Sequence, residues 1–235
     1  MRSLRACCAQ ARYRCTFQLS PLHSAAFNSK LWSQQSDIEH CSDGACCQMR
    51  PDHLLYGQPG LTALMNQSPC NTTGGCGAAK WAAGHLRTNA LVSDGTWSVV
   101  ARIAHSPGGG PTPPFAFTCF GGYVGSPAHN EISMCWEGSS QGTLGAAFWY
   151  SSAEHKTSLP LGFDASLDFH NYTVSWTPSA IQWGVDGKVL HTDTGAAGKT
   201  IPWEPMALTV IIRPRELAYS GDAELSIRSF SYTSA

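Results

Sequence analysis

Residues 129–138 read HNEISMCWEG, and this stretch decides how the chain folds. Side chains along a β-strand alternate between its two faces, so a strand here has two chemically different sides. Ile132, Met134 and Trp136 share one side, which we expect to face a hydrophobic core. The opposite side carries polar or sulfur-containing side chains: Glu131, Ser133, Cys135 and Glu137. The sequence therefore predicts a strand that covers a core with one face and lines a surface groove with the other.

Short apolar runs separated by turn residues continue on both sides of this stretch. The runs that predict strands are 86–91, 97–104, 115–120, 131–137, 172–176, 181–185, 207–213 and 223–232. Gly121-Gly122 is expected to end the strand before it, and Asp186-Gly187 is expected to form a tight hairpin turn, because Asp-Gly supplies positive φ angles. No run has sustained helical periodicity. Many short strands joined by turns predict an all-β, two-sheet antiparallel β-sandwich of the jelly-roll type.

The overall composition bounds the kind of partner. Charged residues make up 13% of the 235 residues, and the formal net charge is -1. A chain with so little net charge has no field that would attract nucleic acid or an anionic membrane. No apolar run is long enough to span a bilayer. A neutral polysaccharide needs no such field, so the charge balance is compatible with a carbohydrate partner and with no nucleic-acid partner.

The cysteines are concentrated in the first third of the chain. Ten are present, and eight of them precede residue 77. The spacing lacks the paired C-x2-C pattern of zinc sites, so we expect no metal and favour disulfides between loops, with free thiols and metal binding as the alternatives. The candidates for these disulfides are Cys41, Cys46, Cys47, Cys70 and Cys76.

The N-terminal residues differ from the rest of the chain. Residues 1–25 are expected to be an extension outside the fold, and 26–235 a single β-sandwich domain whose part 26–80 is rich in cysteine. The cysteines, together with sequons at Asn66, Asn71 and Asn171, favour a secretory or extracellular route. The first residues contain no uninterrupted apolar stretch and so form no recognisable signal peptide.

Two sets of residues resemble glycoside hydrolase family 16. His129, Glu131, Ile132 and Gly138 match the active-site strand His-Asp-Glu-Ile-Asp-Phe-Glu-Phe-Leu-Gly of its xyloglucan-modifying members. Residues 163–187 match the family signature Phe-Asp…Phe-His-x-Tyr…Trp…Trp-x-Val-Asp-Gly at five separate residue types. The similarity covers roughly 80–235. It implies a concanavalin A-like jelly roll, action on or binding of a β-glucan-type polysaccharide, retaining hydrolysis or transglycosylation, and no cofactor.

The resemblance also implies roles for single residues. Glu131 would be the nucleophile, whereas Ser133 replaces the family's Asp and Cys135 replaces the acid/base Glu. A thiol is a poor proton donor to a glycosidic oxygen. Glu137 is the candidate surrogate acid, although six strand residues separate its Cα from that of Glu131 by about 20 Å unless the strand bulges.

Several alternatives remain open at this point. Cys135 is either a small buried apolar residue or the partner of Cys119 in a disulfide. Candidate substrate-binding residues are His129, Asn130, Trp149 and Trp203. The protein is expected to be a monomer and a glycosidase, and the alternative is an inactive, lectin-like carbohydrate-binding protein on the same scaffold. A third hypothesis is a cysteine-stapled structural component.

Overall fold

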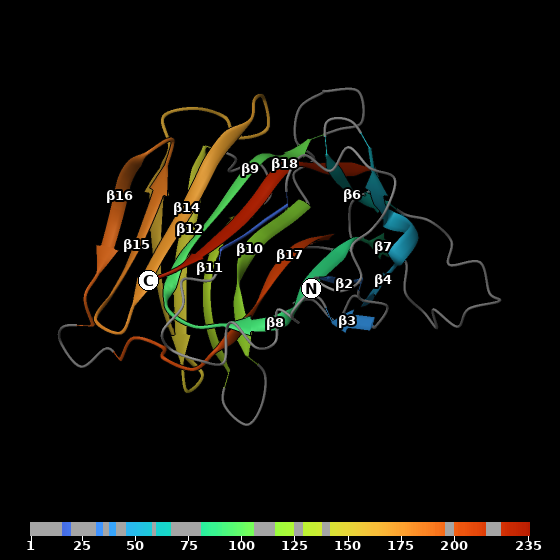
Figure 1. Ribbon diagram of the computed structural model, residues 1–235. Helices are drawn as coiled ribbons and strands as arrows, with labels where there is room; N and C mark the ends of the chain where they lie inside the picture. Colours follow the sequence, from blue (N-terminus) through green and yellow to red (C-terminus); the bar gives the residue numbers. More distant parts are fainter. Residues whose placement is uncertain are drawn as a thin grey trace.

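The computed structural model describes residues 16–19, 32–34, 38–40, 46–57, 60–66, 81–105, 116–124, 129–137, 142–195, 200–214 and 222–235. Within them, the strands form two sheets that face each other (Figure 1). This is the two-sheet β-sandwich predicted from the sequence. Apart from one 3₁₀ turn, η1 (Pro51–His53), the described elements are all strands. No helix among them is long and apolar enough to cross a membrane.

The smaller sheet carries the strand from which the sequence analysis started. Its seven described strands are, in spatial order, β13 (Ala153–Pro160), β12 (Thr143–Tyr150), β11 (Asn130–Glu137), β10 (Ala116–Val124), β17 (Met206–Pro214), β8 (His85–Val92) and β2 (Trp32–Gln34). All neighbouring pairs in this sheet are antiparallel. β11 is therefore an interior strand with a hydrogen-bonded neighbour on each side.

The larger sheet contains 11 described strands. Along its main path they are β16 (Lys188–Asp193), β15 (Ala180–Val185), β14 (His170–Thr177), β9 (Gly95–His105), β18 (Ala223–Ser234), β6 (Leu61–Asn66), β7 (Trp81–Ala83), β4 (Cys46–Met49) and β3 (Ile38–His40). β1 (Thr16–Leu19) pairs with β18, and β5 (Leu54–Tyr56) pairs with β6. The described pairs are antiparallel except β4 with β7.

The core lies between the two sheets, and most of its largest side chains are aromatic. Ile132, Met134 and Trp136 are each 0% exposed, which confirms the predicted inward face of β11. Trp136 packs edge-on against Phe120 of its own sheet and against Tyr172 of the opposite sheet. These contacts fix which face of β11 is left for the groove.

A second aromatic residue ties the opposite sheet to the backbone of β11. Trp183 lies in β15, and its Nε1 donates a hydrogen bond of 3.0 Å to the carbonyl oxygen of Ser133. A buried indole N–H that finds a backbone acceptor removes two desolvation penalties at once. This hydrogen bond fixes the centre of β11 from its core side.

The hairpin predicted at Asp186-Gly187 is confirmed. Val185 pairs with Lys188, and Asp186 and Gly187 have φ values of 51° and 80°. Burial opposes ionisation of Asp186, but the backbone N–H of Asn171 and the His170 ring bond its carboxylate and hold its pKa below the usual value. His170 also stacks on Phe163, so it is a structural histidine here.

Three features differ from the sequence prediction. β10 does not end at Gly121-Gly122 but continues to Val124. Gly121 is a packing position within the strand, since a Cβ there would be 2.7 Å from the Ile132 carbonyl oxygen. The strands β12 and β13 were not predicted, and neither were β2 to β7. Thr16–Leu19, within the expected extension, forms β1 beside β18 and so belongs to the larger sheet.

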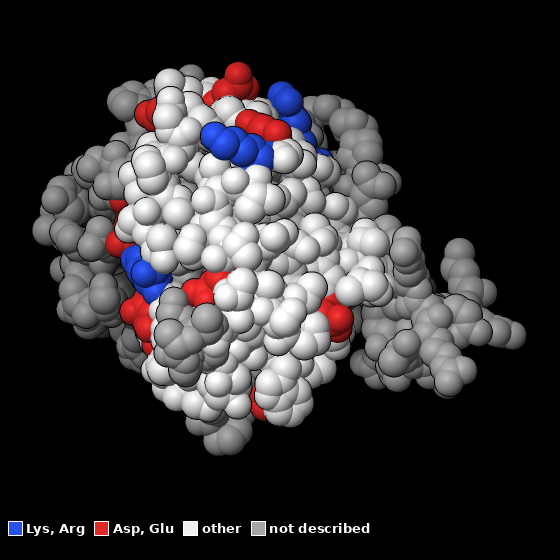
Figure 2. All heavy atoms as spheres, turned by 90° about the vertical axis from the view of Figure 1, so that its left-hand side faces the viewer, with Lys and Arg blue, Asp and Glu red and all other residues white. Residues whose placement is uncertain are grey.

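The described surface carries few charged groups. On the face drawn in Figure 2, Lys, Arg, Asp and Glu side chains are sparse and both signs are scattered among uncharged atoms. This agrees with the low charge content of the sequence. A neutral hydroxylated polymer meets no strong electrostatic barrier on such a surface.

Candidate active site

The outward face of β11 lines a groove, as the alternation of its side chains predicts. Glu131, Ser133, Cys135 and Glu137 all border it. The neighbouring strands contribute the rest of the lining: Phe117, Gly145, Ala147, Trp149, Glu154, Lys156 and Arg213. The small residues Ala147 and Gly145 stand opposite Ser133 and Cys135, and they leave the floor open above the centre of the sheet.

Glu131 stands at one end of this groove in a partly buried position. Its side chain is 22% exposed, and one carboxylate oxygen lies 2.9 Å from Nε2 of His129. The His129 ring sits between two aromatic rings, with centroids 5.1 Å from Tyr123 and 4.9 Å from Trp149. A ring packed on both sides has little freedom to turn, so His129 holds the carboxylate in a fixed orientation.

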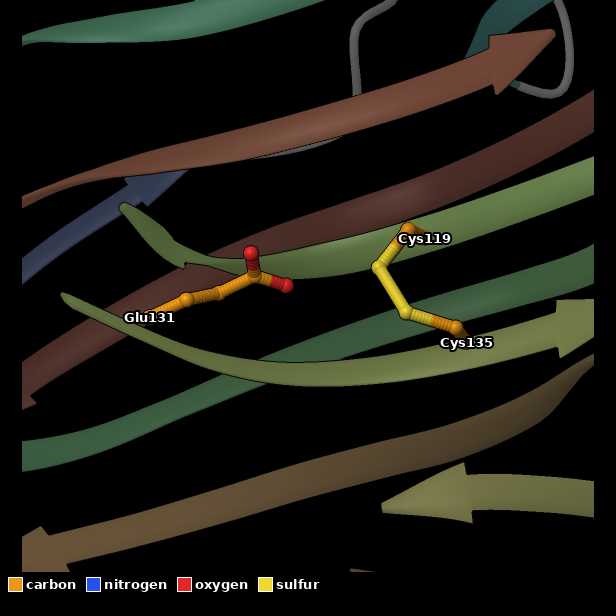
Figure 3. A group of neighbouring side chains, drawn as sticks. All are labelled: Cys119, Glu131 and Cys135. Atoms are coloured by element: carbon orange, nitrogen blue, oxygen red, sulfur yellow. A yellow bond between two sulfur atoms is a disulfide. The ribbon is translucent and has the colours of Figure 1, made fainter. Parts of the chain in front are cut away.

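Cys135, at the position where the family pattern has its acid/base Glu, is bonded to Cys119. The two residues are directly opposite each other on β11 and β10, with a Cα–Cα distance of 4.2 Å. Of the two alternatives for Cys135, the structure has the disulfide. Figure 3 shows the bond on the same face of the sheet as Glu131, whose carboxylate extends toward it.

The carboxylate and both sulfur atoms form a tight group. The ligand atoms of Cys119, Glu131 and Cys135 all lie within 4.8 Å of one another. Cysteine binds metals as the thiolate, and in the disulfide neither sulfur is one. The group therefore consists of a carboxylate next to a disulfide that links β10 and β11.

Ser133 occupies the slot between these two residues but barely reaches the groove. It is 1% exposed, and its hydroxyl has no hydrogen-bond partner among the described residues. A carboxylate at this position would stand next to Glu131 and affect its ionisation. A hydroxyl supplies no such charge, so the electrostatic neighbour of the family pattern is missing.

Glu137 is not brought to Glu131. The pairing of β11 with β10 runs from Asn130 to Glu137 without a register shift, so the strand contains no bulge that would shorten the path. The separation of about 20 Å expected for a regular strand therefore applies. Glu137 instead accepts a hydrogen bond of 2.7 Å from the ammonium group of Lys156.

The predicted substrate-binding residues fall into different environments. His129 and Trp149 lie together beside Glu131. Asn130 is 2% exposed, its amide nitrogen bonds Glu204, and its amide oxygen accepts the backbone N–H of Ser151, so its polar atoms support two loops instead of facing substrate. Trp203 is 61% exposed, but it is not among the residues that line the groove.

Some residues in or beside the groove were out of reach of the sequence analysis. Lys156 and Glu154 lie on β13, a strand that was not predicted, and Tyr123 follows the glycines where β10 was expected to end. The available signal for a groove-lining strand in 143–150 was that Gly145 and Ala147, which share a strand face with Trp149, are small. The predicted disulfide candidates Cys41, Cys70 and Cys76 lie outside the described residues, and the side chains of Cys46 and Cys47 are not described either.

Comparison with known proteins identifies the family. The sequence model described as glycosyl hydrolases family 16 matches residues 45–225, and the chain therefore belongs to that family. A β-glucanase of Paenibacillus polymyxa is 29% identical over 175 residues, which are 72% of this chain and 66% of that protein. A Crh-like protein of Arthroderma benhamiae is 34% identical over 93 residues, covering 36% of this chain and 25% of the relative.

Solved structures show the same fold. The Bacillus licheniformis β-glucanase has a TM-score of 0.75 at 19% identity, over 94% of this chain and 98% of that one. The Crh5 transglycosylase has a TM-score of 0.69 at 16% identity, over 94% of this chain and 84% of the other. The match to the Paenibacillus polymyxa protein spans just under two thirds of that relative's length.

Proposed function

We propose that this protein is a retaining family 16 glycosidase that acts on a β-glucan-type polysaccharide, with Glu131 as the nucleophile. The observation that carries the proposal is the Glu131 carboxylate, held by His129 at the edge of a groove on an interior strand. Family membership over 45–225 and the β-glucanase among its relatives support the substrate class. The sparse surface charge suits a neutral polymer.

The chemistry assigned to Glu131 is formation of a glycosyl ester. Its free carboxylate oxygen attacks the anomeric carbon, and the bond to the leaving glycosidic oxygen breaks. The hydrogen bond from His129 leaves one carboxylate oxygen for this attack and fixes its direction. Trp149, next to His129, offers a half-buried aromatic face on which a sugar ring can stack.

A second candidate function is a carbohydrate-binding protein without turnover. The specific observation in its favour is the Cys119–Cys135 disulfide, which removes any proton donor from the position of the acid/base. Losing a general acid alone costs about 10²–10⁴-fold in rate. Binding would survive this loss, because the groove and Trp149 remain in place.

The experiment that separates these functions compares wild-type protein with Glu131→Gln on mixed-linkage β-glucan. Reducing ends measure turnover, and retardation in glucan-containing native gels measures binding. The proposal predicts turnover in the wild type that falls by at least about 10²-fold in Glu131→Gln with retardation retained. Retardation of both proteins without turnover in either favours the binding protein. Absence of both activities rejects a glucan-directed function.

We also propose that the protein is monomeric. Multi-angle light scattering of the purified chain tests this, with a mass near 25.2 kDa expected. A mass of twice that value would contradict the proposal.

A further inference from the structure

The disulfide in the groove holds together a set of atoms that bind metals when the bond is open. The two sulfur atoms and the Glu131 carboxylate all lie within 4.8 Å of one another. Cys119 and Cys135 are 16 positions apart and meet only because β10 and β11 align them directly opposite each other. No paired cysteine spacing along the sequence therefore indicates this group, although thiolates and carboxylates are ligands that zinc takes in proteins.

The disulfide is open to attack by a small reductant from the groove. Cys135 is partly exposed and borders the groove, whereas Cys119 is 8% exposed. The thiolate of a dithiol attacks the Cys135 sulfur and expels the Cys119 thiolate, and the second thiol of the reductant then displaces Cys135. The protein gains two electrons and two protons and so carries two thiols, while the dithiol leaves as a cyclic disulfide.

The opened pair matches the spacing that one zinc ion requires. Zinc–sulfur bonds are about 2.3 Å long, so two thiolates on a tetrahedral ion stand roughly 3.8 Å apart. The Cα atoms of Cys119 and Cys135 are 4.2 Å apart, and rotation about the Cα–Cβ bonds gives the freed sulfur atoms that separation. The Glu131 carboxylate, which already lies within 4.8 Å of both, supplies a third ligand.

Two neighbouring side chains support a ligand at this position. Nε2 of His129 lies 2.9 Å from one oxygen of Glu131, so it holds the carboxylate in the way that outer partners hold metal ligands and leaves the other oxygen for the ion. Ser133 lies between Glu131 and Cys135 on the same strand face and borders the groove. It is 1% exposed, and its hydroxyl has no partner among the described residues. A buried hydroxyl without a partner is costly, and a zinc-bound water would supply one.

We propose that reduction of the Cys119–Cys135 disulfide creates a zinc site made of the two thiolates and Glu131. The thiols release their protons to solvent as the ion binds, and the fourth coordination position stays open toward the groove. The consequence for catalysis rests on the function proposed above: an ion bound to the Glu131 carboxylate stops its attack on the anomeric carbon. The disulfide thus keeps zinc out of the groove, and its reduction makes turnover sensitive to zinc.

Counting zinc on reduced protein tests the site. Wild type and Cys119→Ala/Cys135→Ala are reduced with dithiothreitol, separated from it by gel filtration under nitrogen, and dialysed against zinc. Because the other eight cysteines are common to both proteins, the inference predicts one additional zinc per chain in the wild type. Without reduction the two proteins should bind equal amounts. Circular dichroism verifies that each protein is folded.

A second pair of variants tests the carboxylate and leaves both cysteines in place. Reduced Glu131→Gln should bind the additional zinc at least about tenfold more weakly than wild type, since even the loss of an outer partner costs about 10–100-fold in metal affinity. Glu154→Gln is the matched control, because it removes another groove-lining carboxylate that lies outside the group. Its zinc affinity should equal that of the wild type. Competition with a chromophoric chelator measures these affinities.

Equal zinc in wild type and the double variant after reduction would overturn the inference, and so would an additional zinc whose affinity is unchanged in Glu131→Gln. Turnover of mixed-linkage β-glucan is measured separately, and zinc should inhibit it in reduced wild type and not in the unreduced protein. Inhibition in neither form would overturn the regulation of turnover by zinc. An additional zinc on a protein without turnover would support the site and reject the catalytic role of Glu131, so the two proposals fail by different results.

Discussion

At the scale of single residues, one strand face decides the fold and the other decides the chemistry. Trp136 is fully buried and packs against Phe120 and Tyr172, whereas Glu131 and Cys135 project from the other side into the groove. The inward residues keep the hydrophobic pattern of a family 16 protein even though two of the three positions of the family's catalytic motif, Ser133 and Cys135, are replaced. Fold and catalysis are thus under separate physical constraints.

Truncating Trp136 tests the inward face directly. Because Trp136 is 0% exposed between the two sheets, Trp136→Ala should lower the free energy of unfolding by about 3–5 kcal/mol. Trp203→Ala is the control, since a 61% exposed tryptophan should cost no more than about 0.5 kcal/mol. Urea unfolding followed by circular dichroism measures both. Similar costs for the two variants would mean that residue 136 is not a core position.

A buried histidine makes stability depend on pH. His105 is 0% exposed and its Nδ1 lies 3.1 Å from the carbonyl oxygen of Ile103. Desolvation lowers the pKa of His105 to about 4, the bond to Ile103 opposes this, and the Arg102 charge adds to it. Glu224 of β18 is the facing carboxylate, 3.6 Å from Nε2.

The sign of the effect follows from the direction of this shift. Between about pH 6.5, where an unfolded histidine titrates, and about pH 4, the unfolded chain binds the proton and the folded one does not, so stability falls as the pH falls. Replacing His105 by Gln should therefore reduce the loss of stability between pH 6.5 and 5, a range mostly above the titration of carboxyl groups. Chemical unfolding of both proteins at several pH values measures this. Parallel pH profiles would show that His105 does not titrate as described.

At the scale of elements, β10 and β11 form the rigid centre of the groove. They are joined by a disulfide between residues separated by 16 positions, and the ladder between them has no register shift. Closing a loop of this length restricts the unfolded chain and contributes about 3 kcal/mol. The groove strand is therefore held by the disulfide as well as by the hydrogen bond from Trp183.

The Cys119–Cys135 disulfide can be tested separately from the other eight cysteines of the chain. Unfolding of wild type and of the double variant Cys119→Ala/Cys135→Ala is compared with and without reductant. Without reductant the variant should be less stable by about 3 kcal/mol, and this difference should shrink once reductant opens the bond in the wild type. Alkylation of Cys119 in the unreduced, unfolded wild type would contradict the assignment.

The elements that the sequence predicted are those with a strong local pattern. The strands at 86–91, 97–104, 181–185 and 223–232 are apolar at their inward positions, and Asp186-Gly187 is an unambiguous turn. β13 was missed because its inward side carries one large apolar residue, Leu159, beside Ala153, His155 and Thr157, while Glu154 and Lys156 line the groove on its other side. An edge strand of this kind is held by its partner and not by a hydrophobic face.

The part of the site that lies within one strand was predictable from the sequence, but the contacts between strands were not. Glu131 and the two replaced positions follow from residues 129–138 alone, because the spacing of two places them on one face. The Lys156–Glu137 pair depends on the alignment of three strands and on a glycine under the lysine, and no single stretch of sequence encodes it. The disulfide remained one of two alternatives until the register of β10 against β11 was known.

At the scale of the whole molecule, a sandwich with a net charge of -1 and few charged groups carries a groove lined by charged groups of both signs. The chain belongs to family 16, and the β-glucanase fold is present across more than nine tenths of its length. What distinguishes it is local: one carboxylate remains where the family pattern has its nucleophile, a disulfide stands where that pattern has its acid/base residue, and Lys156 lies over Gly145 and is ion-paired with Glu137.

Covalent trapping tests most directly whether Glu131 faces the groove as a nucleophile. A fluorinated dinitrophenyl β-cellobioside, whose deglycosylation is slow, should add one sugar unit per chain, and mass spectrometry of the digested protein should locate it on Glu131. The same treatment should leave Glu131→Gln unmodified. A label on another residue, or none on protein that binds glucan, would contradict the assignment of Glu131 as the nucleophile.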